Sequence, residues 1–197
     1  MLAAQRFYIW RDMQNLDSPE ALKLRSSIIR PWTLEDAVAI QRHANNRKIW
    51  MNLRDLFPHP YTLENAHAFL GFVLKEEPKT TFAIATESEA IGCIGLRLGD
   101  DVHRKTAELG YWLGEAFWGR GIMSEGVQEF TRWAFEAFDL RRIFAQPFAD
   151  NVASVRVLEK AGFICEGRLQ ANVFKGGKVL DSFIYARVRD EPGKSGS

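Results

Sequence analysis

The sequence predicts a single α+β domain in which a mixed sheet of six to seven strands is flanked by about four helices. Three observations lead to this fold class. Segments with a two-residue apolar repeat alternate with segments whose apolar residues recur every three or four positions, in the order β-α-α-β-β-β-α-β-α-β-β. Neither a long linker nor an internal repeat interrupts them. Of the 197 residues 46% are hydrophobic and 26% charged, which is enough apolar material for one core.

The N-terminal part is predicted to hold an extension, one strand and two helices. The extension covers residues 1–22 and mixes aromatic with charged residues. A strand over LKLRSSIIRP ends at a proline, which cannot donate to a sheet. Thr33 then starts a helix, because Thr33 and Asp36 have the spacing of a capping box. Thr62 caps a second helix with apolar residues at three- and four-residue spacing.

The middle of the chain is predicted to be β-rich. TTFAIAT and AIGCIGLRL have the composition of two strands joined in a hairpin. TAELGYWLG alternates strictly, which indicates a strand with one face packed on the core. The apolar face carries Ala107, Leu109, Tyr111 and Leu113, and the opposite face carries Glu108, Gly110 and Trp112.

The C-terminal part is predicted to alternate helix and strand before two closing strands. Its elements are a helix over 124–138, a strand over RRIFAQPF, a short helix over DNVASVRVLEKAGF, and strands over about 163–170 and 180–189. The domain therefore spans residues 23–190. The polar EPGKSGS stretch over 191–197 is expected to be a disordered tail.

Charge and residue counts exclude several classes of partner. Lys and Arg total 26 against 25 Asp and Glu, and this net charge of +1 offers no electrostatic footprint for nucleic acid or a membrane surface. Cys93 and Cys165 lie in apolar contexts and are expected to be reduced core residues. The four histidines lack metal-ligand spacing, so no metal is expected. With no signal peptide or membrane-spanning stretch in the sequence, a cytoplasmic location is expected.

The string FWGRGIMSEG places two glycines and an arginine between a strand and a helix. The first N–H groups of a helix are unpaired and its N-terminus carries about half a positive charge, so glycines there let a pyrophosphate approach closely. A plain turn before a helix is the alternative interpretation. The spacing of Gly119, Gly121 and Gly126 does not fit a dinucleotide-binding GxGxxG, and no GxxxxGK[ST] string is present.

Two motifs in this order resemble the GNAT superfamily of N-acetyltransferases, in particular its branch of ribosomal-protein N-terminal acetyltransferases and their relatives. AELGYWLGEAFWGRGIMSEGV is similar to the family's strand, bend and pyrophosphate loop. DNVASVRVLEKAGF is similar to its second signature, N-x-x-S followed by a helix that ends in Gly-Phe, and GKVLDSFIYAR to the final strand of the branch. The resemblance covers residues 24–189 and implies a three-layer, mostly antiparallel α/β/α-like domain.

The resemblance also implies acetyl-CoA as cosubstrate and a set of residues that bind it. Loop amides would hold the diphosphate, and N–H groups at the strand end would stabilise the oxyanion. The residues so implied are Trp112, Leu113, Trp118, Gly119, Arg120, Gly121, Ile122, Met123, Ser124, Asn151 and Ser154. The chain departs from the usual family loop at Trp118 and Met123. It also has Leu158 where many members carry a tyrosine that acts as general acid.

Two residues are candidates for catalysis by direct attack of an amine in a ternary complex. Glu108 is the candidate general base, directly or through a water, with a solvated strand carboxylate as the alternative. Ser154 lies one helical turn after Asn151 and is a candidate to contact or protonate the departing thiolate. Helix capping is the alternative role for Asn151 and Ser154.

The expected acceptor is a primary amine, first the N-terminal α-amine of a protein or peptide. A small amine (a polyamine, amino acid, amino sugar or aminoglycoside) is the second hypothesis. A polycationic acceptor would need several carboxylates around the cleft, and the sequence offers Asp55, Glu64, Asp100, Asp101 and Asp181. A catalytically silent acyl-CoA-binding module is the competing class, which Leu158 supports. The protein is expected to be a monomer or a homodimer.

Residues 46–61 join the two N-terminal helices, where the family places an acceptor-side loop. Aromatic side chains are further candidates for the acceptor pocket, with core packing as the alternative for each. They are Trp32, Trp50, Phe57, Tyr61, Trp112 and Phe174, and Tyr185 on the last strand is a weaker candidate.

Overall fold

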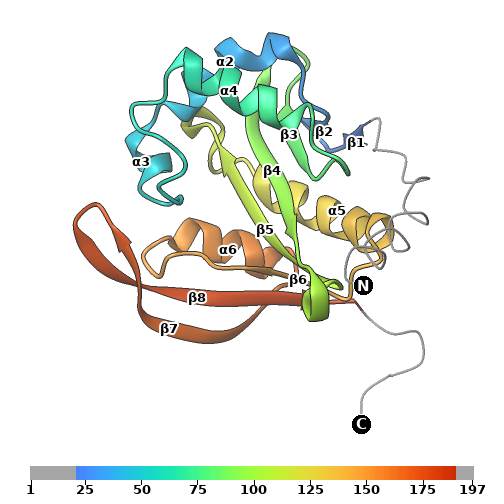
Figure 1. Cartoon of the computed structure of the whole chain (residues 1–197), viewed down its shortest axis with the longest axis vertical. Helices are drawn as coiled ribbons and strands as arrows, with labels where there is room; N and C mark the ends of the chain where they lie inside the picture. Colours follow the sequence, from blue (N-terminus) through green and yellow to red (C-terminus); the bar gives the residue numbers. More distant parts are fainter. Residues whose placement is uncertain (1–20, 190–197) are drawn as a thin grey trace, which may run out of the picture.

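A computed structural model of the protein describes residues 21–189. The strands in this range form one mixed sheet in the order β1-β2-β3-β4-β5-β6-β8-β7 (Figure 1). Only β5 and β6 are parallel; the other neighbours are antiparallel. The strands are β1 (Leu22–Lys23), β2 (Ile28–Arg30), β3 (Thr81–Ala85), β4 (Ala90–Leu98), β5 (Thr106–Leu113), β6 (Arg142–Ala145), β7 (Ile164–Lys175) and β8 (Lys178–Val188). The predicted mixed, mostly antiparallel sheet is confirmed.

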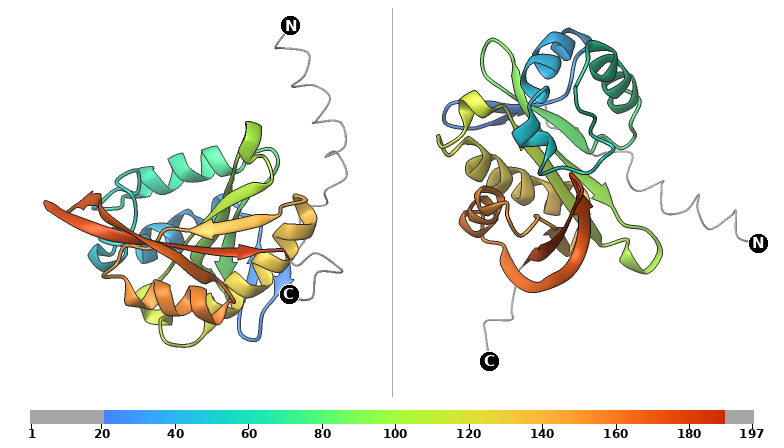
Figure 2. Two further views of the ribbon diagram at one scale, coloured as in Figure 1. Left: turned by 90° about the horizontal axis from the view of Figure 1, so that it is seen from below. Right: turned by 90° about the vertical axis from the view of Figure 1, so that its left-hand side faces the viewer.

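Helices cover both faces of this sheet, as expected for a three-layer domain (Figure 2). They are α2 (Ala37–Ala44), α3 (Arg47–Trp50), α4 (Leu63–Val73), α5 (Ile122–Ala137) and α6 (Val152–Lys160), with short 3-10 turns η1 (Leu34–Asp36), η2 (Asp101–His103) and η3 (Glu115–Phe117). Helices α5 and α6 pack on the face that carries Ala107, Leu109 and Leu113. Helices α2 and α4 pack on the opposite face, to which Trp112 belongs. The alternation predicted for β5 is therefore confirmed.

The sheet has more strands than the six to seven predicted, because the expected single strand over LKLRSSIIRP is a hairpin. Strand β1 pairs antiparallel with β2, and the Leu24 N–H donates to the Ser27 carbonyl oxygen at 2.9 Å. The polar turn reverses the chain before the apolar residues of β2 begin. The last two strands are also longer than predicted, and the one-turn helix α3 was not predicted.

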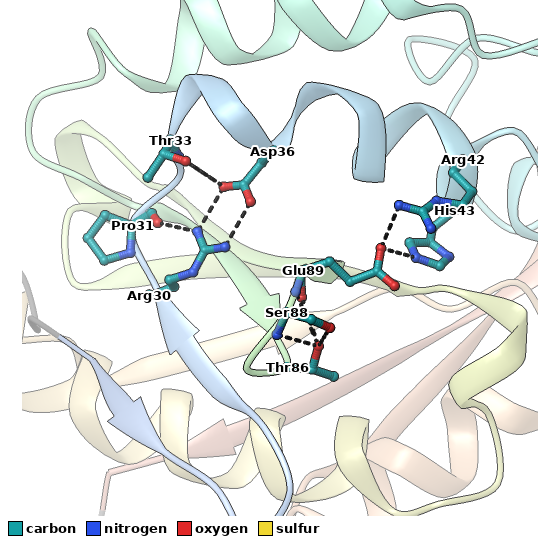
Figure 3. A network of polar contacts seen from close by, with 9 residues as sticks. All are labelled: Arg30, Pro31, Thr33, Asp36, Arg42, His43, Thr86, Ser88 and Glu89. Carbon is teal, nitrogen blue, oxygen red and sulfur yellow. Dashed lines mark hydrogen bonds and ion pairs between the residues drawn. The ribbon is translucent and has the colours of Figure 1, made fainter.

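The predicted capping box at Thr33 and Asp36 is present and also joins β2 to the helix layer (Figure 3). Asp36 accepts a 3.0 Å hydrogen bond from the Thr33 N–H and two of 2.8 Å from the Arg30 guanidinium. Burial opposes the charged form of Asp36, but the bonds from Arg30 and Thr33 outweigh it and hold the pKa of this carboxyl below its usual value. Thr62 caps α4 as predicted.

The two cysteines lie in different environments. Cys93 is buried, as predicted, and burial raises the pKa of its thiol to about 12. Cys165 is exposed, so its prediction as a core residue was wrong. It lies on β7, an edge strand whose residues are mostly exposed, so apolar sequence neighbours there do not indicate a core position.

The predicted extension over residues 1–22 lies almost wholly outside the described residues, as does the predicted tail over 191–197. Between residues 21 and 189 no helix combines the length and apolar character needed to cross a membrane.

Candidate functional site

The site is built where the two parallel strands part. Residues Thr106–Glu108 of β5 pair with Arg142–Phe144 of β6, and Glu108 is the last paired position. Strand β5 continues to Leu113, whereas β6 ends at Ala145. Beyond Glu108 this edge of β5 pairs with no strand within residues 21–189, so its outward N–H groups can donate to another group.

The glycine loop leads into α5 with the geometry of an anion site. Gly119 and Gly121 have φ of 74° and 80°, and a Cβ on either would meet nothing within 4 Å. The left-handed backbone rather than crowding is thus the reason for glycine at both positions. Gly121 is the N-cap of α5 and no side chain caps the helix, so the first N–H groups, those of Ile122 to Ser124, have no intrahelical acceptor.

Trp118 ties this loop to the end of β5. Its indole Nε1 donates a 2.7 Å hydrogen bond to the Leu113 carbonyl oxygen, although 43% of the residue is exposed. Arg120 lies over the Phe117 ring, 5.4 Å from its centroid. Trp118, one of the two residues that depart from the family loop pattern, thus links the loop before α5 to the end of β5, a contact that sequence spacing did not reveal.

Glu108 is not a solvated carboxylate. Only 13% of its side chain is exposed, and its two oxygens form ion pairs with Arg54 and Arg97. Each carboxylate oxygen has a second lone pair and can accept one more hydrogen bond, so Glu108 can still contact an amine or a water. Neither arginine was a sequence candidate, because Arg54 is distant in sequence and Arg97 reaches Glu108 only through the β4–β5 register.

The N-terminus of α6 brings Asn151 and Ser154 to β5. Asn151 Oδ1 accepts a 3.1 Å hydrogen bond from the Ser154 N–H, so the capping role is present. This cap engages only the amide oxygen and leaves the NH₂ group as a donor. Ser154 Oγ lies 2.7 Å from the Tyr111 hydroxyl, and Leu158 is fully buried in the core. The position of the usual family tyrosine thus holds no protic group.

Residues 46–61, called here the 46–61 segment, are tied to three parts of the molecule. Asn46 Nδ2 donates to Glu115 at 2.7 Å, and Lys48 pairs with the same carboxylate. Arg54 reaches Glu108 on β5, and Asp55 accepts a 2.6 Å hydrogen bond from Lys175 on β7. The segment thus lies between η3, which leads into the glycine loop, β5 and the β7–β8 hairpin (Figure 1).

Some of the aromatic candidates gather beside this segment and others do not. Phe57 is 4.9 Å from Tyr61 and 6.0 Å from Trp112 between ring centroids, so these three form one cluster. Trp50 stacks with His59. Trp32 packs on Phe69 and belongs to the same buried core as Tyr61, against which Phe57 and Trp112 also pack. Tyr185 is buried in the other core cluster, and Phe174 is 70% exposed, so neither is in this group.

The chain resembles acetyltransferases over most of its length. It is 37% identical over 109 residues to the ribosomal-protein-serine acetyltransferase of Escherichia coli K12, a match that covers 55% of this chain and 60% of that protein. It is 30% identical over 169 residues to the uncharacterized N-acetyltransferase YnaD of Bacillus subtilis, covering 83% of this chain and 94% of that protein. Mycobacterium smegmatis RimJ, solved in complex with a CoA-disulfide, has the same fold with a TM-score of 0.78 at 22% identity, over 89% of this chain and 90% of that one.

A family model described as an acetyltransferase (GNAT) domain matches residues 27–164, which hold the parting strands, the glycine loop and the Asn151–Ser154 helix start. The glycine loop and the Asn151–Ser154 helix start are the features that the two sequence motifs predicted, whereas the parting of β5 from β6 was not predicted. The chain belongs to the GNAT acetyltransferase family.

Proposed function

We propose that this protein is an acetyl-CoA-dependent N-acetyltransferase that acts on a primary amine, namely the N-terminal α-amine of a protein or peptide. The observation that carries the proposal is the free edge of β5 beyond Glu108, joined through Trp118 to the uncapped N-terminus of α5. The helix N-terminus suits the diphosphate of a thioester cosubstrate, and the strand N–H groups suit the oxyanion formed at its acetyl group. The nearby carboxylate of Glu108 suits the attacking amine.

Different residues bind the different parts of acetyl-CoA. Acetyl-CoA, when bound, supplies an activated acetyl thioester. Amides from Ile122 to Ser124, with Arg120, hold the diphosphate, because they are unpaired donors beside a positive helix end. The NH₂ group of Asn151 binds the pantetheine arm, and N–H groups of β5 near Leu113 stabilise the oxyanion.

Glu108 acts on the proton of the attacking amine, and Ser154 on the departing thiolate. Glu108 accepts the amine proton directly or through a water, which keeps the nucleophile neutral at the moment of attack. Ser154 donates a hydrogen bond to the departing thiolate, in place of the missing tyrosine at Leu158. Glu108 is the last residue of β5 paired with β6, where the free edge begins, and Ser154 contacts Tyr111 on β5 beyond it.

Charges around the site favour an α-amine over a polycation. Asp55 and Asp181 are paired with Lys175 and Arg168, and Asp100 and Asp101 lie on the β4–β5 turn, at the opposite end of β5 from Trp112. Glu108 is already paired with two arginines, and Glu115 with Lys48. An α-amine titrates at about pH 8, so a useful fraction is neutral without strong assistance from a base.

The test is release of coenzyme A, read as free thiol, from acetyl-CoA with a panel of acceptors. The panel holds peptides that begin with Ala, Ser, Thr or Met, beside polyamines, amino acids and aminoglycosides. Turnover with the peptides alone supports the proposal, and turnover with a small amine alone replaces the acceptor class. No turnover together with thermal protection by acetyl-CoA would support the binding-module hypothesis instead.

A further inference from the structure

The Tyr111 hydroxyl is the side-chain group that contacts Ser154 Oγ. Their oxygens are 2.7 Å apart, an ordinary length for an O–H···O hydrogen bond. The Ser154 carbonyl oxygen is 3.4 Å from the same hydroxyl, which is too long for a good bond. Tyr111 lies on β5 beyond the last residue paired with β6, on the face that packs against α5 and α6.

The direction of this bond decides where the Ser154 proton points. A hydroxyl has one proton to donate and two lone pairs that accept. Phenols are more acidic than aliphatic alcohols, so Tyr111 is the better donor and Ser154 the better acceptor. With Tyr111 as donor, the single proton of Ser154 is free for a second acceptor outside the pair.

We propose that Tyr111 is a positioning residue, whose hydroxyl donates to Ser154 Oγ and so directs the Ser154 proton at the sulfur of the departing coenzyme. The inference rests on the proposed function, in which Ser154 contacts that thiolate. Two neighbouring facts give it weight. Leu158 is fully buried and offers no proton donor, and Tyr111 is the tyrosine that the fold places against this serine instead.

Tyr111 supplies a hydrogen bond rather than a proton. Burial raises the pKa of its phenol well above the ordinary value, although the bond with Ser154 partly offsets this. The hydroxyl therefore stays protonated over the whole range in which an α-amine is acetylated. A chain of two hydroxyls is also more polarised than one, which strengthens the bond from Ser154 to a negative sulfur.

The experiment uses Tyr111→Phe, Ser154→Ala and the double variant, each with the full chain. The first readout is the pKa of the bound coenzyme A thiol, followed by ultraviolet absorbance of the thiolate as pH is raised. We expect wild-type protein to lower this pKa, Ser154→Ala to abolish the effect, and Tyr111→Phe to remove part of it. The second readout is turnover, which should fall about two- to tenfold in Tyr111→Phe with the KM for acetyl-CoA unchanged.

The double variant distinguishes a positioning role of Tyr111 from a general structural one. The double variant should be no worse than Ser154→Ala alone, because Tyr111 acts only through Ser154. Tyr185→Phe is the matched control, since it also removes a buried tyrosine hydroxyl, which contacts Glu159 at 3.2 Å and not Ser154. It should leave the thiol pKa and turnover unchanged.

Three results would overturn the inference. Additive losses in the double variant, or an unchanged thiol pKa in Tyr111→Phe, would show that Tyr111 does not act through Ser154 while leaving the proposed function in place. Failure of wild-type protein to bind coenzyme A at all would remove the proposed function and this inference together. Melting temperatures of all variants check that each is folded.

Discussion

Lys175 Nζ lies 2.6 Å from Asp55 Oδ1 and 3.9 Å from the centre of the Trp50 ring, with only 2% of its side chain exposed. A buried ammonium is held between a carboxylate and an aromatic face that both belong to the 46–61 segment. Arg54, next to Asp55 in the chain, is bound to Glu108. Two consecutive residues thus anchor the proposed acceptor side to β7 and to β5.

Loss of the Asp55 carboxylate should loosen this anchor. Asp55→Asn removes the charge partner of a buried ammonium, so the 46–61 segment should exchange its amide hydrogens faster. We expect the KM for the peptide acceptor to rise about threefold to tenfold while that for acetyl-CoA is unchanged. Asp139→Asn, which removes an exposed partner of Lys105, is the control and should change neither. An equal rise in both KM values would contradict a role confined to the acceptor side.

Glu108→Gln should lower turnover most at low pH. A glutamine cannot take the amine proton, and general-base catalysis contributes about a hundredfold or more. The loss should shrink as the pH passes about 8, where α-amines are neutral without help. Turnover against pH, with acetyl-CoA binding measured separately, checks this. Arg97→Gln is the control: it removes one ion-pair partner but keeps the carboxylate, so its effect on turnover should be small. If the effect of Glu108→Gln on turnover did not vary with pH, Glu108 would have a structural role as the centre of two ion pairs.

A negative side chain in the glycine loop should abolish acetyl-CoA binding. Gly121→Glu puts a carboxylate at the α5 N-cap and forces a side chain onto a φ of 80°. Thermal protection by acetyl-CoA should disappear, whereas Gly71→Glu, on an exposed part of α4 with open space around it, should retain it.

Arg120→Glu tests the same site without backbone strain. It reverses one charge in the loop and should weaken acetyl-CoA binding about tenfold or more, measured by titration calorimetry. Undiminished binding in both Gly121→Glu and Arg120→Glu would place the diphosphate elsewhere.

The partly buried Arg30–Asp36 pair should make the free energy of unfolding fall as the pH is lowered. The pKa of Asp36 is lowered in the folded state, so its contribution is present above the unfolded value of about 3.9 and is lost as pH falls through the folded value. Asp36→Asn should lower the free energy of unfolding at pH 7 by about 1–3 kcal/mol, with a smaller difference from wild type below about pH 4. Urea unfolding at both pH values measures this. Glu129→Gln, in an exposed pair, should cost at most about 1 kcal/mol at either pH.

The thiols of Cys93 and Cys165 should react at very different rates. Cys165 is exposed and Cys93 is buried with a raised pKa, so a disulfide reagent should label one thiol quickly and the other only after denaturation. Substitution Cys165→Ser should remove the fast phase. A fast phase that persists in this variant would mean that Cys93 is reached in the folded protein.

Much of the fold was predictable because its signals are local. Thr33 with Asp36, Thr62 at the start of α4 and the strict alternation of β5 each need only neighbours in the chain. The hairpin of β1 and β2 was missed because two short strands and the polar turn between them have the composition of one continuous strand. Cys165 was misplaced for a related reason, since apolar neighbours do not reveal that a strand lies at a sheet edge.

The sequence by itself determined the glycine loop, the Asn151 and Ser154 helix start and the family, because these depend on residue type at short, regular spacing. Only the tertiary structure decided which distant side chains meet. The contacts of Arg54 with Glu108, Lys175 with Asp55 and Tyr111 with Ser154 each join elements far apart in the chain. Such pairs follow from strand order and register, which place residues in space and which no local pattern encodes.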